Sequence, residues 1–488
     1  MNTSIIRYIL GQVMKVEALL MLLPCMVALI HGEEEGFGYI IVLSIIGITG
    51  ILATIKKPSS NVFYLKEGCV ATSLSWIILS IFGCLPFMIT GEIPSFTDAL
   101  FETISGFTTT GASILSDVEA LSYCSTFWRS FTHWVGGMGV LVFILAIVPL
   151  SGGSNINLMR AESPGPSVGK LVPKIRTTAR LLYIIYFAMT FIQVILLLLG
   201  RMPVFDAFTT AFGTAGTGGF GIKNNSLAGY SAYIQWVVTI FMILFGVNFN
   251  AYYLILLRQF RKSFSMEEVR YYFAIIAGAI GIIMLDICRT TGRVLTALRH
   301  ASFQVASIIS STGFATTDFN KWSQTSKCVL VLLMFIGACA GSTGGGIKVS
   351  RIVIILKTVL KELNAYIHPK SVKIINLDGK PVEHEVVRAT NVYFMTFMII
   401  FTLSIFAVSL EGRGALTTFT AVIATLNNIG PGLGQVGPTG NFGILSHLSK
   451  YVLMFDMLAG RLELFPLLIL FHPAMWLEML VSKSKKIK

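Results

Sequence analysis

The feature that most constrains this chain is a series of long apolar runs separated by short polar segments. About 20 apolar residues are enough to cross the hydrocarbon core of a bilayer as a helix. Only 12% of the 488 residues are charged, whereas about 25% is usual in a soluble protein. The sequence therefore predicts an all-α polytopic membrane protein with ten transmembrane helices, near residues 12–30, 37–55, 67–90, 126–150, 176–200, 231–257, 270–290, 326–356, 390–410 and 449–472.

The charged residues predict the orientation of these helices. The net charge is +13, and lysine and arginine gather around residues 56–57, 160–180, 258–270, 348–388 and 483–488. Ten membrane crossings place all five segments on one side, and basic loops mark the cytoplasmic side of a membrane protein. We therefore expect both termini in the cytoplasm. The basic residues alternate with apolar runs and form no single patch, which favours membrane lipid as the surroundings and argues against nucleic acid as a partner.

The residues needed for catalysis or nucleotide binding are missing. The seven cysteines show no spacing typical of a metal site or a redox pair. The sequence has no nucleophile–base arrangement, no P-loop and no dinucleotide fingerprint after a strand. The glycine-rich residues 213–221 lie in a predicted outer loop. We expect that the chain is not an enzyme and that it binds no nucleotide itself.

A short glycine-containing motif occurs four times along the chain, at nearly even intervals. Each copy lies on the predicted outer side and follows an apolar stretch too short to cross a membrane, at residues 95–107, 203–212, 295–310 and 415–426. The motifs are Thr108, Thr109, Thr110, Gly111; Ala215, Gly216, Thr217, Gly218; Ser310, Ser311, Thr312, Gly313; and Asn427, Asn428, Ile429, Gly430. The repeating unit is therefore a span, a pore helix, a glycine loop and a second span (M1–pore helix–M2).

This pattern predicts five parts in the chain. Residues 1–62 hold two N-terminal transmembrane helices that belong to no repeat. The four repeats occupy residues 63–165, 166–265, 266–388 and 389–488.

The four loops have the chemistry of a cation filter. Non-helical backbone at membrane depth survives only where it lines a cavity or is buried in protein, and inward-facing carbonyls can replace the water around a cation. Glycine permits the positive φ that such turns need, and helix C-termini carry a partial negative charge. No carboxylate occurs in the loops, which suits K⁺ better than Ca²⁺. One such glycine alone would indicate helix packing, but four at equivalent positions favour the walls of one pore.

The eighth apolar run contains a second unusual segment, with Gly337, Gly341, Ser342, Thr343, Gly344, Gly345 and Gly346 close together. Each glycine inside a helix costs about 1 kcal/mol relative to alanine, so this run should break the helix. A close helix crossing through small residues is the alternative, but it accounts for only one or two of the glycines. We predict a gate loop beneath the filter.

Arg461 lies within the last apolar run, where an arginine indicates a functional residue by default. A cation there would repel K⁺ and form a barrier in the path. The alternative is a structural ion pair with Glu463 or Asp456.

Three further features leave their roles open. Asn248 and Asn250 either line the cavity or bridge helices, and we expect a structural role for His133. Residues 372–382 carry strand-forming residues around Asp-Gly, which predicts a hairpin. That hairpin either binds a cytosolic partner or packs on the protein's own inner face.

The chain resembles a known family. The fourfold plan with its Thr-Thr-Thr-Gly, Ser-Thr-Gly-Phe and Asn-Ile-Gly-Pro-Gly-Leu-Gly loops is similar to the Trk/Ktr/HKT superfamily of potassium transporters. Residues 127–139, Phe-Trp-Arg-Ser-Phe-Thr-His-Trp-Val-Gly-Gly-Met-Gly, resemble the first inner helix of that family, and the two extra N-terminal helices resemble its bacterial Trk branch.

The resemblance implies a function and partners. The family takes up K⁺ as a homodimer with one pore per subunit, and a cytosolic nucleotide-binding regulatory ring controls the gate. Glycine at the key filter position of every repeat goes with K⁺, and here all four positions are glycine. The family also carries a loop that obstructs the pore in its third repeat, together with a pore-facing arginine that Gly460-Arg461-Leu462-Glu463 matches. A bacterial inner membrane is the implied location.

Two functions follow from these observations. The first is potassium uptake through the four-loop filter, with K⁺ as the transported ion. The alternative is a secondary transporter that couples a solute or cation to H⁺ or Na⁺, because such folds also use broken helices and repeats. Asp456 and Glu463 are the chief acidic residues within the spans that could serve such coupling.

Overall fold

The computed structural model describes residues 1–58, 64–137, 139, 175–370 and 373–476, and almost all of their regular structure is helical. The helices are α1 (Thr3–Leu20), α2 (Leu22–His31), α3 (Gly36–Ile55), α4 (Leu65–Ile89), α5 (Phe96–Phe107), α6 (Tyr123–Gly137), α9 (Ile175–Leu199), α10 (Val204–Ala215), α11 (Ala232–Phe245), α12 (Phe249–Leu256), α13 (Phe260–Ser265), α14 (Glu267–Thr291), α15 (Val294–Ile309), α16 (Gln324–Ile336), α17 (Val349–Ile367), α18 (His384–Ser409), α19 (Ala415–Leu426), α20 (His447–Arg461) and α21 (Phe465–Leu468). The two short strands are β1 (Asn376–Leu377) and β2 (Lys380–Pro381).

Six continuous apolar segments of the described residues are long enough to cross a membrane. They are Thr3–His31, Gly36–Ile55, Leu65–Ile89, Arg180–Leu199, Glu267–Arg289 and His384–Ser409. The predicted polytopic membrane fold is confirmed, although the first span begins at residue 3 and not near residue 12.

Three of the ten predicted spans are not continuous helices, and only one of these breaks was predicted. The span near 326–356 breaks between α16 and α17, as the glycines there predicted. The span near 231–257 bends by 91° between α11 and α12. The span near 449–472 ends as a helix at Arg461, because Glu463 and Leu464 both have positive φ. The predicted span 126–150 begins as α6, and beyond Gly137 most of it lies outside the described residues.

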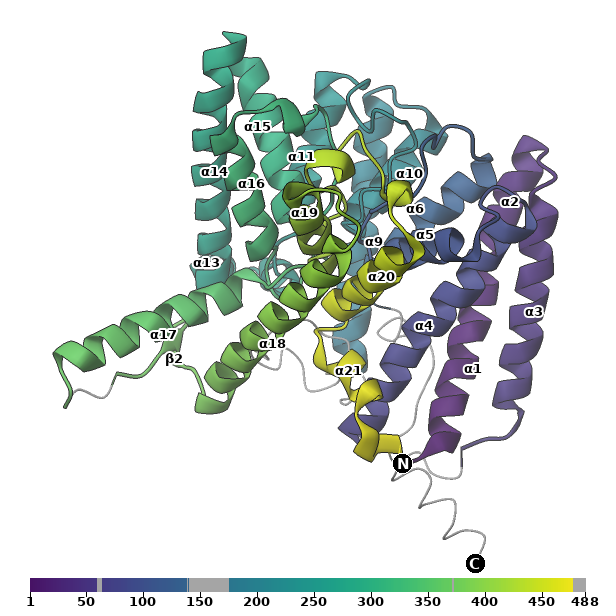
Figure 1. Ribbon diagram of the computed structural model, residues 1–488, viewed down its shortest axis with the longest axis horizontal. Coiled ribbons are helices and arrows are strands. Elements are labelled where there is room, and N and C mark those ends of the chain that lie inside the picture. Colours follow the sequence, from purple (N-terminus) through teal and green to yellow (C-terminus); the bar gives the residue numbers. More distant parts are fainter. Residues whose placement is uncertain (59–63, 138, 140–174, 371–372, 477–488) are drawn as a thin grey trace, which may run out of the picture.

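Four short helices, α5, α10, α15 and α19, lie in the upper half of the molecule (Figure 1). The Ser95 side chain caps α5, and α10 follows Pro203, so both helices begin where the short apolar stretches begin. In the first turn of α10, Asp206 accepts a 2.8 Å hydrogen bond from the Tyr230 hydroxyl. Burial, together with this bond, raises the pKa of Tyr230. The phenol therefore remains protonated and keeps donating to Asp206 at neutral pH.

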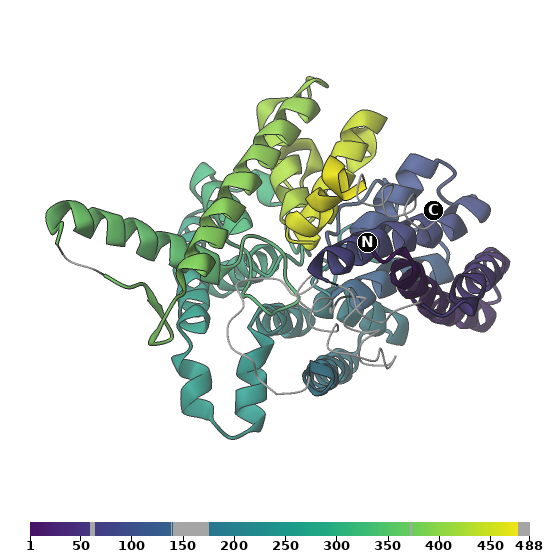
Figure 2. The same ribbon diagram turned by 90° about the horizontal axis from the view of Figure 1, so that it is seen from below.

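The helix α17 leaves the body of the molecule and carries the short hairpin beside it (Figures 1 and 2). The hairpin turn has positive φ at both Asp378 and Gly379, which is the type I′ geometry that Asp-Gly favours. The Asp378 carboxylate accepts a 2.6 Å hydrogen bond from the Glu267 backbone N–H, and the carbonyl of Asn376 accepts one from Lys357. The predicted hairpin is confirmed, and it packs on the protein's own α14 and α17.

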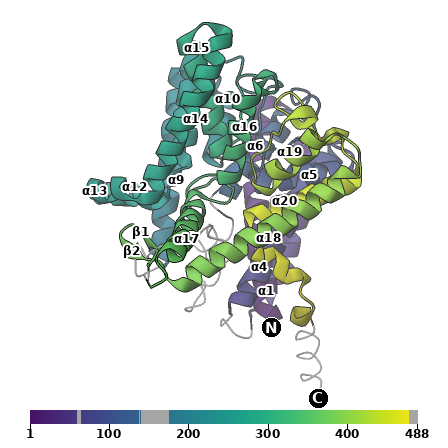
Figure 3. The ribbon, with the colours of Figure 1, turned by 60° about the vertical axis from the view of Figure 1, so that its left-hand side comes forward.

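The helices α12 and α13 turn sideways from the foot of α14 (Figure 3). The bend that produces this turn lies at Gly246, Val247 and Asn248. Asn248 caps α12 by accepting from the Asn250 backbone N–H, and it donates to Glu268 of α14. Of the two roles considered for Asn248, helix bridging is the one that the structure shows.

Glycines bring α1 and α3 into close contact. A Cβ atom placed on Gly11 would lie 2.7 Å from the Thr54 side chain, and one on Gly50 would lie 3.0 Å from the Gly11 carbonyl oxygen. Such close backbone approach is a common way for membrane helices to associate. At Gly47 of α3, by contrast, a Cβ atom would make an ordinary contact of 3.8 Å with Ala18.

We expect Gly11→Ile to separate α1 from α3 and to destabilise the protein by about 1–3 kcal/mol, the usual cost of overpacking. Thermal unfolding in detergent measures this effect. Gly47→Ile, on the same interface, is the matched control and should lower the melting temperature less, because a Cβ atom there makes only an ordinary contact. Equal melting temperatures for both variants would show that this contact does not hold the two helices together.

Candidate functional site

The four loops that follow the short helices share one backbone conformation. The helices α5, α10, α15 and α19 end at Phe107, Ala215, Ile309 and Leu426. In each loop a residue with positive φ comes first (Thr109 55°, Thr217 54°, Ser311 58°, Asn428 53°), and a glycine with positive φ follows two residues later (Gly111 76°, Gly219 71°, Gly313 85°, Gly430 96°). The intervening residue donates its N–H back into the helix in every repeat, to Ser105, Gly213, Ser307 and Ala424 at 2.8–2.9 Å.

This geometry corrects the predicted register of the second loop by one residue. Gly219, and not Gly218, is the structural equivalent of Gly111, so the second motif runs from Gly216 to Gly219 and Ala215 is the last helical residue. Phe208 lies ten residues before Gly218, as the buried Phe101 lies ten residues before Gly111, and this spacing favoured Gly218. Phe208 is 38% exposed, whereas its neighbour Thr209 is fully buried. The other three motifs keep their predicted register.

The four glycines close a ring. A Cβ atom on Gly111 would collide with the carbonyl oxygen of Gly218, and one on Gly219 with that of Thr312. Gly313 meets the carbonyl oxygen of Ile429 in the same way, and Gly430 meets that of Thr110. Each loop thus lies against the next in the order one, two, three, four and back to one. We call these four glycines and the four carbonyls that precede them the glycine ring.

Hydroxyl groups brace the ring from behind. Thr108 and Thr110 share a 2.8 Å hydrogen bond, and Ser310 and Thr312 share an equivalent one of 2.7 Å in the third loop. Asn428 donates 2.9 Å hydrogen bonds to the Thr110 hydroxyl and to the Met457 carbonyl. These side chains therefore bond to one another or to helices, and the backbone carbonyls are the groups that recur at the same position in all four loops.

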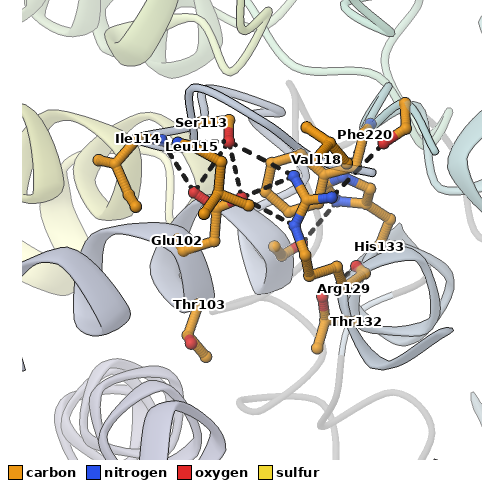
Figure 4. A network of polar contacts seen from close by, with 12 residues as sticks. Glu102, Thr103, Ser113, Ile114, Leu115, Val118, Arg129, Thr132, His133 and Phe220 are labelled. Carbon is orange, nitrogen blue, oxygen red and sulfur yellow. Dashed lines mark hydrogen bonds and ion pairs between the residues drawn. The ribbon is translucent and has the colours of Figure 1, made fainter. Parts of the chain in front are cut away.

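A buried ion pair lies behind the first loop (Figure 4). The Glu102 carboxylate accepts hydrogen bonds from the Ser113 hydroxyl at 2.9 Å and from the Ile114 N–H at 3.0 Å. Arg129 of α6 pairs with the same carboxylate at 2.7 Å. Neither residue was among the predicted site residues. The sequence carried two signals, an acidic residue within a short apolar stretch and an arginine within the predicted span 126–150.

His133 holds the first pore helix to the second loop, also seen in Figure 4. Its Nε2 accepts a 3.2 Å hydrogen bond from the Phe220 N–H, so Nδ1 is the atom that carries the proton and donates to the Gly106 carbonyl at 2.8 Å. The imidazole ring of His133 is fully buried. The structural role expected for His133 agrees with these contacts.

The predicted gate residues form a non-helical segment between α16 and α17, residues 337–348, which we call the glycine-rich loop. It lies directly against the filter motifs. The Gly345 N–H donates to the Ser311 hydroxyl. A Cβ atom on Gly344 would meet the carbonyl oxygen of Ser310, and one on Gly345 that of Asn427. The break comes from Gly337 and Gly346, whose φ values are 73° and 84°.

Two buried charged residues hold this loop. Lys348 is 2% exposed, and its ammonium donates to the carbonyls of Gly344 and Gly345. Glu268, 5% exposed, accepts from the backbone N–H groups of Ala340 at 2.6 Å and Ser350 at 3.1 Å. The sequence analysis missed both, because Glu268 lies 72 residues from Ala340 along the chain and nothing in its own surroundings marks the contact.

Arg461 contacts the glycine-rich loop from α20. Its guanidinium donates to the Thr343 carbonyl at 3.0 Å and to the Gly136 and Gly137 carbonyls of α6. The two carboxylates considered as its partners have other contacts: Glu463 pairs with Arg351, and Asp456 accepts a 2.7 Å hydrogen bond from Ser404. Arg461 thus links three segments below the ring.

Charged ligands for a metal do not gather anywhere in the part of the chain that the structure describes: no group of three or more His, Cys, Asp or Glu side chains could hold an ion. Carbonyl oxygens suit weakly hydrated monovalent cations, whereas divalent ions prefer carboxylates. The ring can therefore offer dehydrated coordination to an ion such as K⁺.

Comparison with known proteins agrees with this architecture. Residues 37–482 match the TrkH family model, described as a cation transport protein. The chain is 33% identical to the Trk system potassium uptake protein TrkH of Halomonas elongata, over 98% of this chain and all of that protein. It is 34% identical to the TrkH of Escherichia coli K12, over 94% and 96%. The crystal structure of the potassium transporter TrkH from Vibrio parahaemolyticus superposes with a TM-score of 0.88 at 31% identity, over 98% of this chain and all of that one.

The matched region contains the four short helices α5, α10, α15 and α19, the glycine ring and the glycine-rich loop. The chain belongs to the TrkH family of cation transport proteins, and it is a transporter rather than an enzyme.

Proposed function

We propose that this protein takes up K⁺ across a bacterial inner membrane, with the glycine ring as its selectivity filter. The observation that carries the proposal is the closed ring of four equivalent loops, in which every glycine lies against a carbonyl of the next repeat. The relatives named above are potassium uptake proteins. The proposed filter residues are 108–111, 216–219, 310–313 and 427–430.

Electrostatics supports a monovalent cation at the ring. Each pore helix ends four residues before its ring glycine, so four partly negative helix termini face the same place. The loops contain no carboxylate, and dipoles alone hold K⁺ loosely enough to release it. The membrane potential would drive inward flux with about 2.3 kcal/mol per charge per 100 mV.

The glycine-rich loop is the proposed gate. It lies against Ser310, Ser311 and Asn427 on the inner side of the ring, where its backbone would close the path. Lys348 and Arg461 add two positive charges next to this loop, and both would repel a leaving cation. Withdrawal of the loop would open the pore.

Regulation and assembly extend the proposal. We propose a homodimer, cytoplasmic termini and a cytosolic nucleotide-binding Trk-type ring as partner. The division of the chain into residues 1–62 and four repeats belongs to the same proposal. Coupling of flux to H⁺ or Na⁺ stays the alternative mechanism.

We expect Gly111→Ser to lower the ratio of K⁺ to Na⁺ uptake by about tenfold, equivalent to 1.4 kcal/mol between the ions. A side chain at this position would collide with the Gly218 carbonyl, and the backbone there has φ 76°. Uptake of both ions into proteoliposomes measures the ratio.

Gly91→Ser is the matched control for Gly111→Ser, because Gly91 also has positive φ (78°) but has open space around it. This control should keep the wild-type ratio. If Gly111→Ser kept it as well, the ring would not be the filter.

We expect Glu268→Ala to raise K⁺ flux several-fold without changing the K⁺/Na⁺ ratio. The substitution removes the two hydrogen bonds that the Glu268 carboxylate accepts, one from the Ala340 N–H of the loop and one from the Ser350 N–H at the start of α17. Each is worth about 1.5–3 kcal/mol, so their loss loosens the glycine-rich loop. Flux in proteoliposomes checks the result, and Glu362→Ala on the exposed part of α17 is the control. Unchanged or reduced flux in folded Glu268→Ala protein would contradict the gate assignment.

Nucleotide should act only through the partner. We expect ATP or ADP to leave the flux of the purified chain unchanged and to alter it at least twofold once the regulatory subunit is bound. Co-purification and flux measurement test the two halves separately. Loss of both association and nucleotide response would remove this part of the proposal.

A further inference from the structure

We propose that the buried Glu102–Arg129 pair is a positioning device that sets the spacing between the first and second loops of the ring, and through it the selectivity for K⁺. This inference rests on the proposed role of the glycine ring as the filter. It assigns ion selectivity to two residues that lie outside the four proposed filter motifs.

Glu102 holds the outer half of the first loop. It is 1% exposed and lies on α5, nine residues before Gly111. Its carboxylate bonds to Ser113 and Ile114, the second and third residues after Gly111. The loop leaves the ring at this point, so the carboxylate fixes the direction in which the chain departs from Gly111.

Arg129 connects the first loop to the second loop. It is 2% exposed, and its Nε donates to Glu102 at 2.8 Å. On its other side it donates to the Gly221 carbonyl at 3.4 Å, and its guanidinium carbon lies 4.1 Å from the centre of the Phe220 ring. Phe220 directly follows Gly219. One rigid side chain therefore joins the exits of two neighbouring loops, as Figure 4 shows.

The joined loops contact each other at the glycine ring itself. Gly111 of the first loop lies against the carbonyl of Gly218 in the second. That carbonyl is one of the ring oxygens, so a small change in the distance between the loops moves an oxygen that faces the ion. Ion selectivity depends on the number and position of such dipoles, which is why a bond behind the ring can change it.

The charges of the pair must also balance. Buried ion pairs contribute little net stability, but removing one partner leaves an uncompensated buried charge. Without Glu102 the charge of Arg129 would lie unneutralised behind the carbonyls and would repel a cation at the ring. The pair therefore acts on the ion both through geometry and through charge.

The other repeats hold their loops differently. The positions that correspond to Glu102, nine residues before each ring glycine, are Thr210, Gln304 and Ala421. In the fourth repeat the Thr420 hydroxyl accepts from the Leu433 N–H at 2.9 Å, and in the third the Ser307 hydroxyl donates to the Phe314 carbonyl. Of these four equivalent positions, only the one in the first repeat carries a charged side chain. A requirement to hold the loop in place, which all four repeats share, would not explain this difference.

Three variants test the inference: Glu102→Gln, Arg129→Lys, and the double variant Glu102→Met/Arg129→Met, which removes both charges together. Each is compared with Gly111→Ser and with Asp98→Asn. The last breaks the 2.6 Å Asp98–Lys450 pair at the opposite end of the same pore helix. Uptake of K⁺ and Na⁺ into proteoliposomes is measured only on protein that elutes as folded material in size exclusion.

We expect the K⁺/Na⁺ ratio to fall about tenfold in Glu102→Gln or Arg129→Lys, the change carried by one hydrogen bond to a charged group, while Asp98→Asn keeps the wild-type ratio. Stabilisation by K⁺ in thermal unfolding should weaken in parallel. If the single variants do not fold, a lowered ratio in the folded double variant supports the inference.

A wild-type ratio in folded variants, together with a lowered ratio in Gly111→Ser, would overturn the inference and leave the proposed filter intact. A wild-type ratio in all of them would overturn both. If none of the three variants folds, the pair serves stability alone and the inference also fails.

Discussion

The architecture depends on where irregular backbone can exist inside a membrane protein. Peptide groups outside helices need partners, because hydrocarbon offers none. Here the four loops satisfy part of their backbone by donating back into the short helices that precede them, and they press against one another at the ring glycines. The remaining carbonyls are the groups that a dehydrated cation can use. The short helices, their termini and the close packing of the loops are thus consequences of one constraint.

The glycine-rich loop meets the same constraint with different means. Its peptide groups are satisfied by the Glu268 carboxylate, the Lys348 ammonium and the Arg461 guanidinium. Charged groups replace the backbone partners that the four ring loops find in their own helices. Since Glu267, next to Glu268, contacts both Lys357 of α17 and Asp378 of the hairpin, the supports of the loop are continuous with α17 and the hairpin.

Much of this was visible in the sequence, for identifiable reasons. Apolar length predicted membrane helices, Asp-Gly predicted the hairpin turn, and the glycines of the eighth run predicted its break. The register of the second loop was misjudged because Ala215 to Gly219 offers several glycines, and only backbone dihedrals distinguish Gly219 from Gly218. No run of glycines marks the breaks after Phe245 and Arg461. The apolar pattern therefore predicted continuous helices at both places.

Local properties of the chain therefore set its membrane nature, its repeats and the conformations that its glycines permit, because each depends on composition or on neighbouring residues. Tertiary structure decided which distant groups meet. The pairing of Glu102 with Arg129, of Glu268 with Ala340 and of each ring glycine with the next loop's carbonyl joins residues from different helices. Such contacts depend on how the helices pack in three dimensions. The spacing of residues along the chain does not reveal which of them will meet.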